Sequence, residues 1–267
     1  MKKISDLMNL KGRTALITGA TGGIGQEIAL TIAELGGDLL LVDRPGSNYD
    51  SIKEKIFDNW NVNIECIDCN LESESSRKIL IERVSGRDKE LNIIINNAAF
   101  VGESDLKGWV TDFEDQDIET WRRALEVNLT AIFHLSQGLL KKLKNSKSSS
   151  IINISSIYGM NGPDYSLYKG TEMGNPAAYA ASKGGLIQLT RWLATTVAPD
   201  IRVNSISPGG VWRNQPKKFV ERYEFRTPLA RMATEEDFKG VVAYLASDLS
   251  AYVTGQNIIV DGGWTVW

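Results

Sequence analysis

Cysteine and histidine are scarce in this 267-residue sequence, which has two cysteines and one histidine. Cys66 and Cys69 form a CxxC pair, but the alternating run NVNIECIDCN predicts a strand, in which residues three apart point to opposite faces. A zinc site needs further ligands, and His134 is far away in sequence. We therefore predict two reduced thiols and no metal site. For His134, in the helical pattern LTAIFHLSQGLLKKL, we predict helix packing or a subunit contact.

Long apolar runs and an excess of one charge are also missing. No segment approaches the roughly 20 apolar residues of a membrane span, and the amino end has no uninterrupted apolar stretch typical of a targeting signal. The formal net charge of −3 gives no general reason to expect nucleic acid or an anionic membrane as partner. We expect a soluble, cytoplasmic protein. Its length and 42% hydrophobic content predict one domain over residues 1–267.

Apolar, β-rich runs alternate with longer helical patterns along the chain. Several of these runs are apolar almost throughout, as expected when helices cover both faces of a parallel sheet. The pattern predicts an α/β fold, a Rossmann-like doubly wound parallel sheet of about seven strands with helices on both faces. The predicted strands are 14–18, 38–43, 62–68, 91–97, 150–156, 201–207 and 256–263.

Two segments are longer than simple connections require, residues 100–118 and 158–176. Both follow the carboxyl end of a predicted strand. Ligands of open α/β sheets bind at that edge, so we interpret both segments as insertions that shape a substrate site.

The run TGATGGIG follows the first predicted strand and opens a helix, with glycines at Gly19, Gly23 and Gly25. Glycine permits a tight turn and lets the backbone approach a pyrophosphate, while the helix amino end supplies free N–H groups. Asp43 ends the second strand, 24 positions after Gly19, where a carboxylate can accept hydrogen bonds from ribose hydroxyls and repel a 2′-phosphate. We therefore favour NAD over NADP, although Arg44 could partner a phosphate if Asp43 turned away.

Tyr179 and Lys183 lie four residues apart in AAYAASKGGLIQLTRWLA, so they share one face of a predicted helix. A phenol has an ordinary pKa near 10, and nearby positive charge is needed for it to act as a base at neutral pH. Lys183, together with an oxidised nicotinamide ring, could supply that charge. The pair predicts acid/base chemistry but needs partners, because a Tyr-x-x-x-Lys spacing is common.

Those partners occur in order, and from about Lys11 to Gly263 the chain resembles the single-domain type of the short-chain dehydrogenase/reductase family, which has a YxxxK active site. The resemblance rests on the glycine run, Asp68 after the third strand, NNAA at 96–99, Asn128 in EVNLTA, Ser156 in NISSIYG, YAASK, ISPGG and the ending YVTGQNIIVDGG. It implies cofactor contacts from Gly19, Thr21, Gly23, Ile24, Gly25, Asp43, Arg44, Asp68, Cys69, Asn97, Ala98, Ala99, Tyr179, Lys183, Pro208, Gly209 and Val211.

The resemblance also implies catalytic roles. Ser156 hydrogen-bonds the reacting oxygen, Tyr179 gives or takes its proton, Lys183 holds the nicotinamide ribose and lowers the tyrosine pKa, and Asn128 positions a water that relays protons. Elementary chemistry agrees, because hydride transfer leaves alkoxide-like charge on the substrate oxygen, and preorganised O–H donors stabilise that charge.

Three features depart from the family pattern. Ala99 replaces the last glycine of NNAG, and Arg213 replaces a threonine that contacts the carboxamide, which puts that contact in doubt. The interval from Ser156 to Tyr179 is 23 residues, longer than the family's usual spacing. The catalytic residues can then come together only if the second insertion bulges over the substrate pocket.

The segment 211–231 corresponds to the family's substrate lid and is rich in cations. Its basic residues are Arg213, Lys217, Lys218, Arg222, Arg226 and Arg231, against only Glu221 and Glu224. They favour an anionic substrate such as a sugar phosphate or nucleotide sugar, although a solvated helix face or a subunit contact explains them equally well. The candidate substrate contacts are Trp109, Tyr168, Lys169 and Arg213, with Tyr165 and Glu172 in the second insertion as further candidates. That insertion is similar to one in short-chain enzymes of bacterial surface-glycan and nonulosonic-acid gene clusters, which implies carbohydrate metabolism.

Other functions remain open. One is reduction of a 3-oxoacyl group on a carrier protein, or of an apolar alcohol or its ketone, and another is a nicotinamide-sensing protein without chemistry. Asp43, the cationic lid and the full set Asn128, Ser156, Tyr179 and Lys183 argue against them. The family is usually a dimer or tetramer, and Trp264 and Trp267 in the ending WTVW could bury in a neighbouring subunit. We therefore expect a homo-oligomer, and the resemblance implies a homotetramer.

Overall fold

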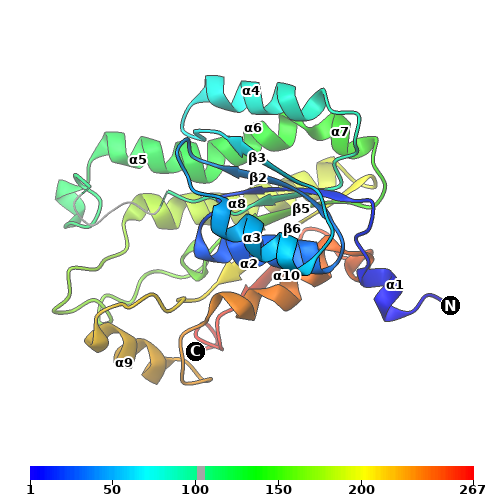
Figure 1. Cartoon of the computed structure of the whole chain (residues 1–267). Helices are drawn as coiled ribbons and strands as arrows, with labels where there is room; N and C mark the ends of the chain where they lie inside the picture. The colour runs from blue at the N-terminus through cyan, green and yellow to red at the C-terminus, as the bar shows by residue number, and fades with distance from the viewer. Residues whose placement is uncertain (101–105) are drawn as a thin grey trace.

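The computed structural model describes residues 1–100 and 106–267, and part of the first predicted insertion, residues 101–105, lies outside the described residues. Seven parallel strands form one sheet in the order β3-β2-β1-β4-β5-β6-β7 (Figure 1). The strands are β1 (Thr14–Thr18), β2 (Asp38–Asp43), β3 (Ile64–Asp68), β4 (Ile93–Asn96), β5 (Ser149–Ile154), β6 (Ile201–Pro208) and β7 (Asn257–Val260). The order reverses between β1 and β4, where doubly wound sheets bind dinucleotides. The predicted Rossmann-like fold is confirmed.

Helices cover both faces of this sheet. The α-helices are α1 (Ile4–Met8), α2 (Gly23–Glu34), α3 (Asp50–Asn59), α4 (Glu74–Ser85), α5 (Ile118–Leu125), α6 (Ala131–Gly138), α7 (Leu140–Lys144), α8 (Ala177–Thr196), α9 (Lys217–Arg226) and α10 (Lys239–Ala246). Shorter helical turns are η1 (Phe113–Asp115), η2 (Glu126–Thr130), η3 (Ile157–Gly159), η4 (Glu235–Phe238) and η5 (Asp248–Ser250). Helices α2, α3 and α10 pack on one face, and α4, α6 and α8 on the other.

The strand side chains divide between these two layers by simple alternation. Ala15 and Ile17 of β1 join the core under α2, whereas Leu16 joins the core under α4 and α6. All three are fully buried. A strand buried on both faces is mostly apolar, which is why the central residues of TALIT and IIIN form unbroken apolar runs.

The lid helix α9 and the second insertion form a separate small core away from the sheet (Figure 1). Tyr168 of the insertion packs against Phe219 of α9, with ring centroids 5.5 Å apart. Trp264 stacks on Tyr223 of α9 at 5.9 Å and is 1% exposed. The expectation that Trp264 is buried by a neighbouring subunit is therefore wrong, because its own chain covers it. Trp267 remains 72% exposed.

The scarce reactive residues have packing roles. Both cysteines are free, and the buried Cys69 thiol accepts a hydrogen bond from Ser76 at 3.6 Å. His134 lies on α6, where its Nδ1 accepts a hydrogen bond from Arg77 Nε of α4 at 3.1 Å. Within the described part of the chain, no group of His, Cys, Asp or Glu could hold a metal ion, and no helix is long and apolar enough to cross a membrane.

Candidate active site

Three of the four predicted catalytic side chains meet at the carboxyl end of β5. Ser156 begins the turn η3 directly after this strand, and Tyr179 and Lys183 lie in the first two turns of α8. The Ser156 hydroxyl lies close enough to the Tyr179 phenol to lower its pKa. Lys183 Nζ donates to the Ile154 carbonyl at 2.8 Å and lies 5.7 Å from the centroid of the Tyr179 ring. The insertion between Ser156 and Tyr179 therefore leaves this group assembled.

A close backbone contact fixes the start of α8 against η3. A Cβ on Gly159 would lie 2.8 Å from the Lys183 carbonyl carbon and oxygen, so only glycine fits without a shift. The Ser155 hydroxyl donates to that same carbonyl oxygen at 2.9 Å. The Ser-x-x-Gly turn and the Tyr-x-x-x-Lys helix are thus held in contact by backbone geometry.

Burial controls the protonation of both groups on α8. It lowers the pKa of the Lys183 ammonium from 10.5 to about 8. Burial also raises the pKa of the Tyr179 phenol, and the hydrogen bond from Ser156 offsets this only in part. We expected Lys183 and an oxidised nicotinamide ring together to lower the tyrosine pKa. In the chain alone, desolvation of the phenolate is the largest influence and raises that pKa. Tyr179 is a neutral O–H donor in this state.

Asn128, the fourth predicted catalytic residue, lies in the π-helical segment η2 between α5 and α6. Such insertions in α-helices are frequent at functional sites. Its Oδ1 accepts from the Phe100 backbone N–H at 2.6 Å, and its Nδ2 donates to Ser182 Oγ at 3.1 Å. Ser182 in turn donates to the Tyr179 carbonyl at 2.8 Å. Asn128 is completely buried and links the segment after β4 to the helix that carries Tyr179.

The glycine run makes a turn that no other residue could adopt. Gly19 has a φ of +64°, and a Cβ on Gly25 would lie 2.0 Å from the Gly19 carbonyl oxygen. Asn97 Nδ2 donates to the Thr18 and Gly19 carbonyls at 3.0 Å each. Gly22 is the N-cap of α2 and provides no side-chain cap, so the first N–H groups of the helix lack a side-chain partner from that position. This fits a bound pyrophosphate.

The predicted contacts around this turn divide into two kinds. Ala98 lies against Gly19, since a Cβ on Gly19 would be 2.8 Å from Ala98 Cα, and Ala99 continues the same segment. Ile24, by contrast, packs partly into the core under α2. The backbone at Ile24 can contact a cofactor, whereas its side chain packs against the hydrophobic core.

Two carboxylates lie side by side where the adenosine end of a dinucleotide is expected. Asp43 and Asp68 are register partners at the ends of β2 and β3. Asp43 Oδ2 accepts from the Thr21 backbone N–H at 2.8 Å and from Thr21 Oγ1 at 2.7 Å, which fixes its position. Arg44 is exposed, and the Cys69 backbone N–H donates to the Asp43 carbonyl at 2.7 Å. Two acidic side chains thus stand at the ends of β2 and β3, next to the glycine turn.

The segment after β6 borders the opposite side of the glycine turn. Pro208 ends β6, and the Gly209 backbone N–H donates to the Val260 carbonyl at 2.9 Å. The Gly210 N–H donates to the hydroxyl of Tyr223, a lid residue, at 2.5 Å. Val211 forms an isolated parallel bridge with Ala233. The lid is therefore anchored to the edge where the predicted cofactor segment lies.

The four predicted substrate residues do not form one cluster. Trp109 packs in a cluster that includes Tyr179. The Tyr168 hydroxyl is 2.6 Å from that of Tyr158, and the Lys169 side chain is exposed. Arg213 is elsewhere, because it lies against Gly23 of the glycine run. The structure thus places Arg213 at the cofactor side instead of with Trp109.

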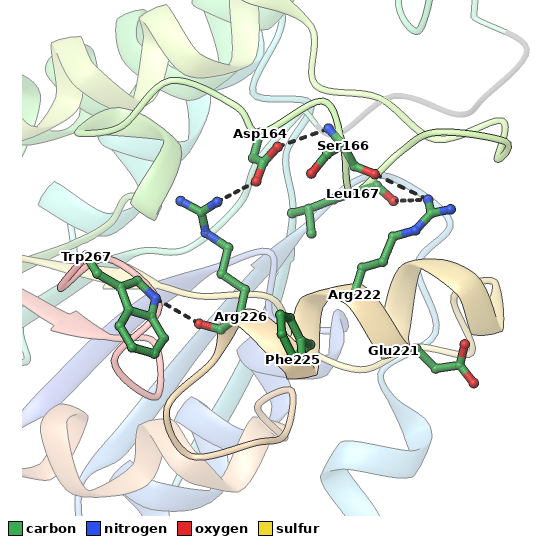
Figure 2. Close-up of a pocket in the computed structure, with 8 residues that line it drawn as sticks. All are labelled: Asp164, Ser166, Leu167, Glu221, Arg222, Phe225, Arg226 and Trp267. Carbon is green, nitrogen blue, oxygen red and sulfur yellow. Dashed lines mark hydrogen bonds and ion pairs between the residues drawn. The ribbon is translucent and has the colours of Figure 1, made fainter.

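Most of the lid cations have partners within the chain (Figure 2). Arg222 Nη1 donates to three carbonyls of the second insertion, and Arg226 pairs with Asp164 of the same insertion. The remaining pairs are Arg213 with Glu235, Lys217 with Glu221 and Arg231 with Asp237. Two of these cations, Arg222 and Arg226, therefore fasten α9 to the insertion, and the other three pair elsewhere in the chain. This removes the main support for an anionic substrate.

A groove of about 670 Å³ lies between the two predicted insertions. Its lining includes Trp109 of the first insertion, which also packs in the cluster containing Tyr179, and Tyr165 of the second. Among the described residues, the charged ones that line it are Asp112 and Glu172, and none of the others is a lysine or an arginine. We name this the insertion groove. A second groove, shown in Figure 2, is lined by residues such as Phe225 and Trp267. None of the four predicted catalytic residues lines either groove, and the insertion groove is connected to them through Trp109, which packs in the cluster that contains Tyr179.

Several residues that support the candidate active site were not predicted from the sequence. Thr18 accepts hydrogen bonds through Oγ1 from two backbone N–H groups after β4, at 3.1 Å each, and Ser182 joins Asn128 to α8. Tyr158 lies two residues after Ser156, so the NISSIYG motif offered a signal for it. Glu235 had none, because its partner Arg213 is 22 positions away and only the fold brings them together.

Comparisons with known proteins agree with this geometry. Residues 19–265 match a family model described as enoyl-(acyl carrier protein) reductase. The 3-oxoacyl-[acyl-carrier-protein] reductase FabG of Aquifex aeolicus is 30% identical, with 96% of this chain and 98% of the relative covered. A short-chain dehydrogenase from Leptospira borgpetersenii with bound NAD⁺ is 33% identical with a TM-score of 0.83, covering 99% and 96%. An NADPH-dependent 3-quinuclidinone reductase from Rhodotorula rubra is 28% identical with a TM-score of 0.87, covering 100% and 96%.

Proposed function

This chain belongs to the short-chain dehydrogenase/reductase family of oxidoreductases, and we propose that it interconverts a secondary alcohol and a ketone with a nicotinamide cofactor. The observation that carries this proposal is the contact of Ser156, Tyr179 and Lys183 at the end of β5. A hydroxyl, a phenol and an ammonium meet there in a water-poor setting, which suits stabilisation of a developing alkoxide.

The residues of the glycine run and of the ends of β1, β2 and β4 fit a dinucleotide. Backbone N–H groups at the start of α2 would hold the pyrophosphate, and Asp43 would accept the ribose hydroxyls. Lys183 would hold the nicotinamide ribose near Tyr179. When bound in its reduced form, the cofactor supplies the hydride.

The proton step belongs to Tyr179. In the reductive direction the phenol O–H bond breaks and a substrate O–H bond forms, as the hydride reaches the carbonyl carbon. The raised pKa of Tyr179 keeps the phenol protonated at neutral pH, so the protein alone is prepared to donate. Ser156 donates to the same oxygen, and Lys183 stabilises the phenolate that remains.

We propose NAD as the cofactor. The supporting observation is the pair Asp43 and Asp68 at the ends of neighbouring strands, because two carboxylates oppose a 2′-phosphate at that position. The relatives include both an NAD⁺ complex and an NADPH-dependent reductase, so the preference rests on this chain's own residues.

The insertion groove favours an uncharged or cationic substrate. Its charged lining residues are both acidic, and five lid cations that predicted a sugar phosphate or nucleotide sugar are paired within the chain. The second candidate is a 3-oxoacyl thioester, which is favoured by the 30% identity to a FabG reductase over nearly the full chain. A phosphorylated sugar ranks below both.

Replacement of Tyr179 by phenylalanine tests the proposed chemistry. The variant keeps the ring in its cluster but has no proton to donate, so turnover should fall at least about 100-fold, the usual contribution of a positioned acid. NADH binding, followed by tryptophan fluorescence, should stay within about twofold of the parent. Unchanged turnover with any substrate of the panel would refute the role of Tyr179.

A substrate panel separates the candidates. NADH oxidation would be followed with small cyclic ketones, a 3-oxoacyl thioester, and an oxidised phosphorylated sugar. Activity on the uncharged or cationic ketones, lost when Glu172 is changed to lysine, supports the insertion groove as the substrate site. Activity restricted to the phosphorylated sugar would contradict it.

A further inference from the structure

An ion pair lies directly over the glycine run. Arg213 Nη2 is 3.1 Å from Glu235 Oε1, and both atoms face Gly23, the first residue of α2. A Cβ on Gly23 would lie 2.6 Å from Glu235 Oε1 and 3.0 Å from Arg213 Nη2. The absence of a side chain at Gly23 is therefore what lets this pair reach the start of the helix.

The backbone near Arg213 and near Glu235 is held in place, whereas the two side chains are partly exposed. The parallel bridge between Val211 and Ala233 sets two segments side by side, and Arg213 and Glu235 each follow their bridge residue by two positions. The bridge thereby brings the two short segments that carry Arg213 and Glu235 next to each other. The side chains are 49% and 31% exposed, so either can leave the pair without unpacking a core.

Further hydrogen bonds fix the turn that carries Arg213. Its backbone N–H donates to Gln215 Oε1 at 2.7 Å, and Gln215 Nε2 donates to the Val211 carbonyl at 2.8 Å. The guanidinium thus projects from a braced turn. Such a preorganised cation loses little freedom when it exchanges one anionic partner for another.

Electrostatics identify the kind of partner that this position takes. The amino end of α2 carries positive partial charge and receives no cap from Gly22, so a lone guanidinium there would be unfavourable. The Glu235 carboxylate pairs with the guanidinium next to this helix start, so its negative charge offsets both positive groups. A built anion site therefore exists over Gly23, and an internal carboxylate fills it.

We propose that Arg213 binds the diphosphate of the dinucleotide and that Glu235 competes with this diphosphate for the guanidinium. The proposal rests on the proposed function, because it takes the dinucleotide as the ligand of the glycine run. Arginine suits the exchange, since its forked N–H groups match phosphate as well as carboxylate. On binding, Glu235 turns to solvent and the diphosphate takes its place between Arg213 and α2.

The competition predicts opposite effects for the two partners. Binding of ADP-ribose, which carries the diphosphate, and of adenosine, which does not, would be measured by calorimetry on the full chain. Arg213→Gln should weaken ADP-ribose about tenfold and leave adenosine unchanged. Glu235→Gln should strengthen ADP-ribose about three- to tenfold, because the competing charge is gone. Thermal unfolding of each variant confirms that it is folded.

Lys239→Gln is the matched control. Lys239 begins α10 just after η4 and pairs with Glu27 and Glu34 of α2, so its replacement removes an ion pair to the same helix away from Gly23. ADP-ribose affinity should stay within twofold of the parent in this variant.

Two results would overturn the proposal while leaving the proposed function intact. If Arg213→Gln binds ADP-ribose like the parent, Arg213 is no diphosphate ligand. If Glu235→Gln weakens the binding of ADP-ribose as much as Arg213→Gln does, the ion pair has only a structural role, because loss of either partner then has the same effect on binding. Failure of the parent to bind NADH and ADP-ribose at all would overturn both proposals.

Discussion

Replacing Lys183 with methionine should change how the stability of this protein depends on pH. Lys183 is 1% exposed, and burial lowers its pKa from 10.5 to about 8. The folded state therefore disfavours the ammonium, and this penalty is fully present below pH 8 and absent above pH 10.5. Between these values the unfolded chain binds more protons than the folded one, so stability of the parent rises with pH.

The structure sets the size of this effect. A pKa difference of about 2.5, at about 1.4 kcal/mol for each pH unit, gives about 3 kcal/mol. The variant also loses the hydrogen bond from Nζ to the Ile154 carbonyl, which shifts its stability by a similar amount in the other direction. At a single pH, the difference in unfolding free energy between parent and variant therefore mixes the two effects. The change of that difference with pH depends only on the titration of the ammonium.

Urea unfolding of the cofactor-free protein at a fixed concentration, from pH 7 to 10.5, measures this change. The free energy of unfolding of the parent should rise by about 3 kcal/mol relative to Lys183→Met across the range. Lys141→Met is the control, because Lys141 is exposed on α7 and its curve should run parallel to the parent's. Parallel curves for Lys183→Met as well would show that the buried amine does not titrate as argued.

Two further variants test the cofactor end. Gly25→Ala places a Cβ 2.0 Å from the Gly19 carbonyl oxygen and should lower the free energy of unfolding by about 3 kcal/mol or more. The control is Gly240→Ala on α10, where a Cβ meets no neighbouring atom within 4 Å, and it should raise the free energy of unfolding by about 0.5–1 kcal/mol. Equal urea midpoints for the two variants would contradict this. Asp43→Asn keeps an oxygen for the Thr21 donors but removes the charge, so the ratio of NADPH to NADH affinity should rise about tenfold. An unchanged ratio in a fluorescence titration would remove Asp43 from cofactor selection.

The catalytic group illustrates what local pattern can predict. Tyr179 and Lys183 share a helix face because of their spacing, and Ser156 lies two residues after a strand whose apolar run is visible in the sequence. The protonation states of Tyr179 and Lys183 could not be predicted from the sequence in the same way. The tyrosine pKa depends on how deeply the phenol is buried, and burial arises from contacts with segments such as that of Trp109, 70 positions away.

The lid shows the opposite case. Its cations are obvious in the sequence, but their partners are carbonyls of the second insertion, Asp164 and residues beyond the lid. The number of cations in a segment does not show which groups they pair with. The sequence therefore favoured an anionic ligand, whereas in the fold these cations form ion pairs within the chain. Trp264 was misassigned for the same reason, since α9 covers it only once the chain is folded.

The sequence by itself determined the doubly wound parallel class of the sheet, the glycine turn and the tyrosine–lysine helix, because each follows from short-range periodicity or from the steric freedom of glycine. Only the tertiary structure decided which charges are free, how acidic the phenol is, and that Arg213 meets Glu235 over Gly23. Those properties depend on distances between residues remote in the chain, and such distances are set by packing.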